Sequence, residues 1–377
     1  MRMTLSSLAM LAATAALSLG ASASAAPAPA TKWSVLKPMF VTIPNNAPGH
    51  HQLIKHPVST LTQWNGSFTD HLNQTITYTM VGTDPATTNA QTAVPVVIIP
   101  IKMVYGNLNG NRNFNPNAIR VSNGKTVTGN LLASPLFKNS VDFVQGGTDV
   151  GKTQYIDAFQ RANFWKYVQN HQQYHVRFGT VTLLKPQTIT VSPAYGQVEQ
   201  NPFGTGLIGT MEIDVFDLKL QNIMAANPDT ITPNVFPMFV AANIYLTEGT
   251  GHEVCCIGGY HSALGSQPAG QTYAYASYDT EPGTFSQDVS AWSHEIGEWM
   301  DDPFVDNSVN CADNSSMEDG DPLENNANYG GFPYTVNGFT YNLQSLVFLG
   351  YFGAPRDTSL HSWLSFQNDE ANVCPGQ

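Results

Sequence analysis

Residues 286–302, SQDVSAWSHEIGEWMDD, constrain the fold more than any other part of this 377-residue chain. Apolar side chains recur there at three- and four-residue steps, which predicts a helix with one buried face; they are Val289, Trp292, Ile296 and Trp299. Ser286 is a suitable N-cap, and Pro303 ends the helix at Asp302. The aromatic run 273–278, just before this helix, predicts a strand.

Most other regular segments are predicted to be strands. The apolar run 94–101 predicts a buried strand, with its prolines indicating an edge or a bulge. Residues 153–171 have near-helical apolar spacing and predict a helix of about five turns. Further strands are expected at residues 174–178, 180–184, 188–191, 208–218 and 236–246. We therefore expect an α+β fold with a β-rich N-terminal half and a mixed sheet packed against the helix.

The composition excludes several classes of protein. Hydrophobic residues make up 42% of the chain and charged residues only 12%, which excludes intrinsic disorder. Asp and Glu number 28 against 16 Lys and Arg, a formal net charge of −12. Because nucleic-acid affinity comes largely from basic residues, we expect no nucleic-acid partner.

The N-terminus has the pattern of an export signal. Arg2 precedes the apolar run 5–19, and the small residues 21–26 offer cleavage sites, so residues 1–25 are predicted to be a signal peptide. The run is shorter than the ~20 residues of a membrane span, and the mature protein is expected to be secreted, extracellular or periplasmic, without a membrane segment. Residues 26–93 are predicted to be an N-terminal arm or linker, and residues 94–377 the main domain.

The mature chain contains four cysteines, Cys255, Cys256, Cys311 and Cys374. In an oxidising compartment an even count implies two disulfides. A bridge between the adjacent Cys255 and Cys256 would need a strained turn. We therefore expect each of them to join one of the two later cysteines.

The helix 286–302 also carries a pattern with chemical meaning. His294 and Glu298 are four residues apart and so lie one turn above the other, and Glu295 follows the histidine directly. This is the H-E-x-x-H zinc helix with a carboxylate in place of the second histidine. Zinc accepts imidazole nitrogen and carboxylate oxygen at similar distances. We expect His294 and Glu298 to bind zinc and Glu295 to be the catalytic general base.

A third metal ligand must come from another segment, and two residues are candidates. His261 lies in CCIGGYHSA, where Gly258 and Gly259 permit a tight turn. Glu318 lies in the acidic segment MEDGDPLEN, downstream of the helix. The sequence leaves both open.

These motifs resemble those of known families. SHEIGEWMDDP, the E-x-x-D at residues 318–321 and the G-Y-H at residues 259–261 look like secreted bacterial proteins with an HExxE-type metallopeptidase core. They are also similar to the plant phosphate-induced, EXORDIUM-like family, and the downstream Glu resembles the gluzincin type of peptidase. The resemblance covers roughly residues 255–321 and implies a zincin-like active-site helix. Its site residues would be His261, His294, Glu295, Glu298 and Glu318.

The sequence is consistent with two functions. The first is a secreted, zinc-dependent metallopeptidase-like hydrolase acting on a peptide or protein substrate. The alternative is a non-catalytic extracellular or cell-envelope binding protein with a structural zinc or calcium site. Calcium is considered because acidic residues interleaved with Asn and Gly could order a long loop around it; they are Asp313, Glu318, Asp319, Asp321 and Glu324.

Overall fold

The computed structural model describes residues 33–50, 59–106, 112–249, 253–312 and 315–375. The expected signal peptide, residues 1–25, lies outside this range. From Trp33 onward the chain belongs to one compact unit. Among the described residues, no helix is both long enough and apolar enough to cross a membrane.

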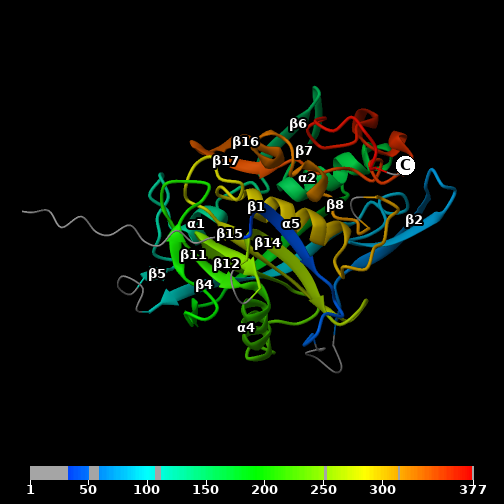
Figure 1. Ribbon diagram of the computed structural model, residues 1–377. Helices are drawn as coiled ribbons and strands as arrows, with labels where there is room; N and C mark the ends of the chain where they lie inside the picture. Colours follow the sequence, from blue (N-terminus) through cyan, green and yellow to red (C-terminus); the bar gives the residue numbers. More distant parts are fainter. Residues whose placement is uncertain (1–32, 51–58, 107–111, 250–252, 313–314, 376–377) are drawn as a thin grey trace, which may run out of the picture. The chain divides into compact units, whose positions relative to one another are not determined.

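A mixed sheet of 11 strands organises this unit (Figure 1). Its strands are β1 (Val35–Ile43), β4 (Gln91–Tyr105), β5 (Arg112–Phe114), β8 (His175–Leu183), β9 (Gln187–Val191), β10 (Val198–Gln200), β11 (Leu207–Glu212), β12 (Phe236–Ala242), β13 (Ile244–Glu248), β14 (Val254–Leu264) and β15 (Gln271–Tyr278). The main path runs β10-β11-β13-β14-β15-β12-β4-β5, with β1 on β14 and with β8 and β9 on β4. Parallel pairs such as β12–β15 and antiparallel pairs such as β14–β15 both occur.

Three two-stranded hairpins and a few helices complete the described structure. The hairpins are β2 (Gln63–Thr69) with β3 (Thr75–Val81), β6 (Val141–Gln145) with β7 (Thr148–Thr153), and β16 (Gly331–Val336) with β17 (Phe339–Gln344). The α-helices are α1 (Val127–Leu131), α2 (Tyr155–Asn163), α3 (Trp165–Val168), α4 (Ile213–Ala225) and α5 (Ser290–Asp301). The fold is thus mixed and mostly β, with a large mixed sheet and few helices, which confirms the expected fold class in this coarse form.

Both faces of the sheet are covered, which explains why its central strands are apolar at nearly every position. Successive residues of β4 point to opposite faces. Val96 and Ile98 belong to the core that includes α5, whereas Val97 and Ile99 belong to the core that includes α4. Figure 1 shows α5 and α4 on opposite sides of β14 and β15. The α5 side carries the candidate site.

Two expectations about regular segments, one helix and one strand, are wrong. Residues 153–171 do not form one helix, because Phe164, with φ −109° and ψ 30°, separates α2 from α3. Residues 208–218 do not form one strand, because β11 ends at Glu212 and α4 begins at the next residue, Ile213. The Glu212 carboxylate accepts a hydrogen bond from the Val215 N–H and caps the new helix.

Other strands follow the expectation more closely. The apolar run 94–101 lies in β4, which pairs with β12 as well as with β8 and β9, so it is not an edge strand. Pro95 sits instead at a register shift between Val94 and Val96, the bulge alternative. Residues 236–246 form two strands, since Asn243 between them has a left-handed backbone with φ 56°.

The stretch 26–93, expected to be an arm or linker, supplies several strands of this unit from Trp33 onward. β1 runs along β14 in the way of a packing arm. The β2–β3 hairpin is joined to the chain after α5, because the Asn307 side chain exchanges hydrogen bonds with the backbone of Thr79 in β3.

The disulfide pairing differs from the expected one. Cys255 pairs with Cys256, Cys311 pairs with Cys374, and no cysteine in the described part of the chain is free. Strand pairing explains the difference, because β14 is held between β1 and β13 at Cys255. The C-terminal segment instead lies beside the loop after α5, where the Ala312 N–H donates to the Pro375 carbonyl.

Candidate metal centre

Helix α5 carries the predicted motif and is buried on every side. It begins at Ser290 rather than near Ser286, because Asp288, with φ 45°, has a left-handed backbone that interrupts the expected helix. It ends before Pro303, as expected. A helix buried all round must satisfy its polar side chains from within the protein.

His294 presents one ring nitrogen to a group of carboxylates. Its Nε2 is 2.9 Å from Glu298 Oε1 and 3.5 Å from Asp321 Oδ1. Its Nδ1 is 2.9 Å from Gln344 Oε1, and the Gln344 amide nitrogen donates to the Gly320 carbonyl at 2.9 Å. Gln344 Oε1 must therefore accept from His294 Nδ1–H, which leaves the Nε2 lone pair free for a metal when the ring is neutral.

His261 is oriented in a similar way from the strand β14. Its Nε2 lies 3.1 Å from the Asp302 carbonyl, which can only accept, so the proton sits on Nε2. Its Nδ1 faces the carboxylates of Glu295, Glu298 and Glu318, at 3.7, 3.6 and 3.8 Å. The expectation of a tight turn at Gly258 and Gly259 is wrong, because both residues lie within β14.

Glycines make room for this arrangement. A Cβ added to Gly259 would collide with the Glu295 carboxyl group, and one added to Gly320 would collide with the His294 ring. A Cβ on Gly297 would meet Leu346, and would come within 3.1 Å of Asp319. A neighbouring segment therefore approaches α5 closely at Gly297.

The carboxylates of the site are buried with few hydrogen bonds. The side chains of Glu295, Glu298 and Glu318 are at most 2% exposed. Both carboxylate oxygens of Glu295 and Glu318 lack a hydrogen-bond partner, and so does Nδ1 of His261. Unpaired buried charge is expensive, so this set of atoms requires protonation or a bound cation.

The pKa values of the site residues are shifted by this burial of unpaired carboxylates. Burial raises the pKa of Glu295 to about 8, and it raises the pKa of Glu318 well above its usual range. Burial also acts to raise the pKa of Glu298, but the neighbouring imidazoles outweigh it and the pKa is lowered. Burial lowers the pKa of His294, yet the charge of Glu298 more than compensates and the pKa is raised. Without a cation, the site therefore tends to hold protons.

Glu298 joins two groups of possible ligands. One group is His261, Glu295 and Glu298, and the other is His294, Asp321 and Glu324; within each, one ligand atom per residue lies within 4.8 Å of the others. Glu298 turns Oε1 to His294 and Oε2 to His261. The first group is closed to solvent, whereas the Asp321 side chain in the second is 34% exposed.

All five expected site residues therefore meet, and three further residues join them. Asp321 and Glu324 come from the acidic run, of which Asp313 lies outside the described residues. Phe40 in β1 stacks on the His294 ring with centroids 4.0 Å apart, and its backbone N–H donates to Glu324 at 2.8 Å. The sequence places the two acids near Glu318 but gives no signal for Phe40, which is distant in the chain.

Comparison of this chain with protein-family models, with curated proteins and with solved structures finds no match.

Proposed function

We propose that this protein is a zinc-dependent hydrolase whose metal is bound by α5 and the segment that follows it. The observation that carries the proposal is the convergence of two imidazole lone pairs on one shared carboxylate, Glu298, among buried oxygens without hydrogen-bond partners. Calcium takes oxygen ligands, whereas imidazole nitrogen suits zinc. The imidazole of His294 therefore favours zinc over calcium.

The zinc is assigned to His294, Glu298 and Asp321. Ligand atoms about 2.1 Å from a tetrahedral zinc lie about 3.4 Å from one another. The separation of His294 Nε2 from Asp321 Oδ1, 3.5 Å, is close to that value, whereas its separation from Glu298 Oε1, 2.9 Å, is shorter. The Asp321 side chain is 34% exposed, so these three ligands also reach solvent, and a catalytic zinc needs an open position.

Glu295 is the proposed general base. A bound zinc would lower the pKa of a water molecule and polarise a substrate carbonyl. Glu295 follows the ligand His294, and neither of its oxygens is engaged in a hydrogen bond. Its carboxylate can therefore accept a proton from water and pass it to a leaving amine. His261 lies 3.7 Å from Glu295 and 3.8 Å from Glu318, and its imidazole would share that proton.

A peptide or protein is the proposed substrate, and secretion the proposed setting. Both rest on the export-type N-terminus and on the resemblance of the His-Glu helix to HExxE-type metallopeptidases. A zincin-like role for α5 belongs to the same proposal.

A structural metal is the second candidate, favoured by one observation. His261, Glu295, Glu298 and Glu318 could surround a cation at 0–2% exposure, and structural zinc sites are closed in this way. In that case Glu295 is a ligand rather than a base, and the protein is a non-catalytic binding protein.

Glu295→Gln distinguishes the two candidates, because Gln keeps the shape of the side chain but cannot act as a base. For the hydrolase we expect zinc content to be retained and cleavage of an unfolded protein substrate to fall by about 10²–10⁴-fold. The control is Glu248→Gln, at the exposed end of β13. Loss of zinc from Glu295→Gln would contradict the base assignment and favour the structural site.

A further inference from the structure

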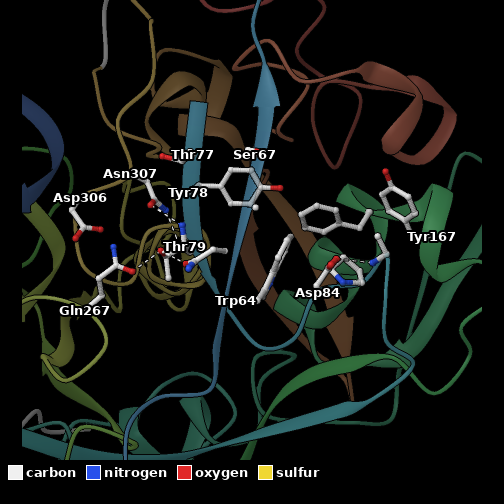
Figure 2. A pocket seen from close by; sticks show the side chains of 15 residues that line it. Trp64, Ser67, Thr77, Tyr78, Thr79, Asp84, Tyr167, Gln267, Asp306 and Asn307 are labelled. Atoms are coloured by element: carbon white, nitrogen blue, oxygen red, sulfur yellow. Dashed lines mark hydrogen bonds between the residues drawn. The ribbon is translucent and has the colours of Figure 1, made fainter. Parts of the chain in front are cut away.

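A cavity lies apart from the metal centre, beside the β2–β3 hairpin (Figure 2). Its volume is about 710 Å³, within the usual range for ligand sites. Residues from the hairpin, the 84–86 turn, the α2–α3 junction and the chain after α5 line it. Figure 2 shows the rings of Trp64, Tyr78 and Tyr167 toward one side and the side chains of Gln267 and Asn307 toward the other.

The aromatic side of this cavity is a rigid arrangement of rings. The Trp64 ring packs edge-to-face against Tyr78 at 5.5 Å and Phe164 at 5.6 Å, with interplanar angles of 83° and 68°. Gly66 permits this packing, since a Cβ there would collide with the Tyr78 ring. Trp64 and Tyr167 stay partly exposed, so their rings are accessible to a ligand. Fixed rings cost little entropy on binding.

The polar side is held by hydrogen bonds to buried groups. The Thr79 hydroxyl lies within hydrogen-bond distance of Gln267 Oε1, at 2.7 Å, and of Asn65 Oδ1, at 2.8 Å. The Asn307 amide donates to the Thr79 carbonyl at 2.8 Å and to the Asp301 carbonyl at 2.6 Å. Thr79 and Asn307 are each 3% exposed. The geometry of this side of the cavity is therefore fixed before a ligand binds.

The charges of the lining exclude one class of ligand. Asp84 and Asp306 line the cavity, and no Lys, Arg or His is among the described residues that do so. An anionic ligand would meet like charge without compensation. A neutral polyhydroxylated ligand would instead stack its C–H faces on the rings and bond its hydroxyl groups to carboxylate and amide oxygens.

We infer that this cavity binds a neutral oligosaccharide. Stacking against Trp64 and Tyr167 and hydrogen bonds to Asp84, Asp306 and Gln267 would hold successive sugar units. The inference does not depend on the proposed zinc chemistry. The two sites are nonetheless linked, because Asn307 donates to Asp302 Oδ1 and the Asp302 carbonyl accepts from His261.

Calorimetric titration of the full chain tests the inference. The probes are soluble hexaoses of β-1,4-linked glucose, of β-1,4-linked N-acetylglucosamine and of α-1,4-linked glucose, with an extended hexapeptide as the competing class. We expect at least one hexaose to bind with a Kd between about 1 μM and 1 mM, and the peptide not to bind.

Variants assign the binding to this cavity. Trp64→Ala should weaken binding on the order of tenfold or more, as the loss of a stacking ring does. Tyr167→Ala, at a partly exposed position, keeps the test valid if Trp64→Ala does not fold. Tyr195→Ala is the matched control, because Tyr195 is 37% exposed and does not line the cavity. Zinc content should be unchanged in all three.

Three results would overturn the inference. They are the absence of hexaose binding up to about 10 mM, hexaose binding that Tyr167→Ala and Trp64→Ala leave unchanged, and preferential binding of the peptide.

Discussion

The two disulfides should differ sharply in what they contribute to stability. The bridge between Cys311 and Cys374 spans 63 residues, whereas Cys255 and Cys256 are neighbours. For a loop of about 63 residues, the entropy removed from the unfolded chain is about 14 cal/mol/K, or about 4 kcal/mol at 25 °C. The neighbouring pair closes no such loop. Both pairs are buried, so the loss of sulfur packing is similar in the two cases.

We expect Cys311→Ala/Cys374→Ala to be less stable than Cys255→Ala/Cys256→Ala by about 4 kcal/mol. With an unfolding entropy of about 2.1 cal/mol/K per residue over residues 33–377, the melting temperatures should differ by about 6 °C. Differential scanning calorimetry of both double variants under non-reducing conditions measures this. If Cys255 and Cys256 were instead each bonded to one of the two later cysteines, each double variant would lose both disulfides. Equal melting temperatures would therefore refute the pairing.

Two further predictions follow from single positions. Gly320→Ala should displace the His294 ring and weaken zinc binding at least about tenfold, whereas Gly106→Ala, where a Cβ meets nothing within 4 Å, should not; equal zinc affinities would contradict the close approach. Burial raises the pKa of Asp288 from 3.8 to about 7. The folded chain therefore keeps a proton that the unfolded chain has released, and stability falls as pH rises between these values, by about 1.4 kcal/mol per pH unit. Asp288→Asn should flatten this slope in urea unfolding from pH 4.5 to 6.5, and an unchanged slope would show that Asp288 is not the cause.

The sequence predicts α5 and β15 well because their patterns are strong and local. Four-residue spacing brings His294 and Glu298 together on any helix, whatever surrounds it. The same kind of spacing is present at Phe216, Leu220 and Met224, which face the second core, and it could have revealed α4. The alternation of apolar and polar residues from residue 208 onward favours a strand. Glu212, however, is an N-cap and marks the start of α4.

Other features depend on contacts between distant segments, and no local pattern encodes these. Gly258 and Gly259 suggest a turn, but in β14 the second of them makes room for the Glu295 side chain. The contact of Phe40 with His294 joins the first strand to the last α-helix. The pairing of Cys311 with Cys374 likewise depends on the C-terminal segment returning to the loop after α5.

Glu298 is the residue on which the proposed metal centre depends most, since its two oxygens face His294 and His261 separately. Zinc content per chain, measured by elemental analysis of the purified protein and of Glu298→Ala, tests this directly. Circular dichroism would establish that the variant is folded. We predict about one equivalent of zinc in the parent protein and none retained by Glu298→Ala after dialysis. A parent protein without zinc, or a folded Glu298→Ala that keeps its full equivalent, would contradict the proposed centre.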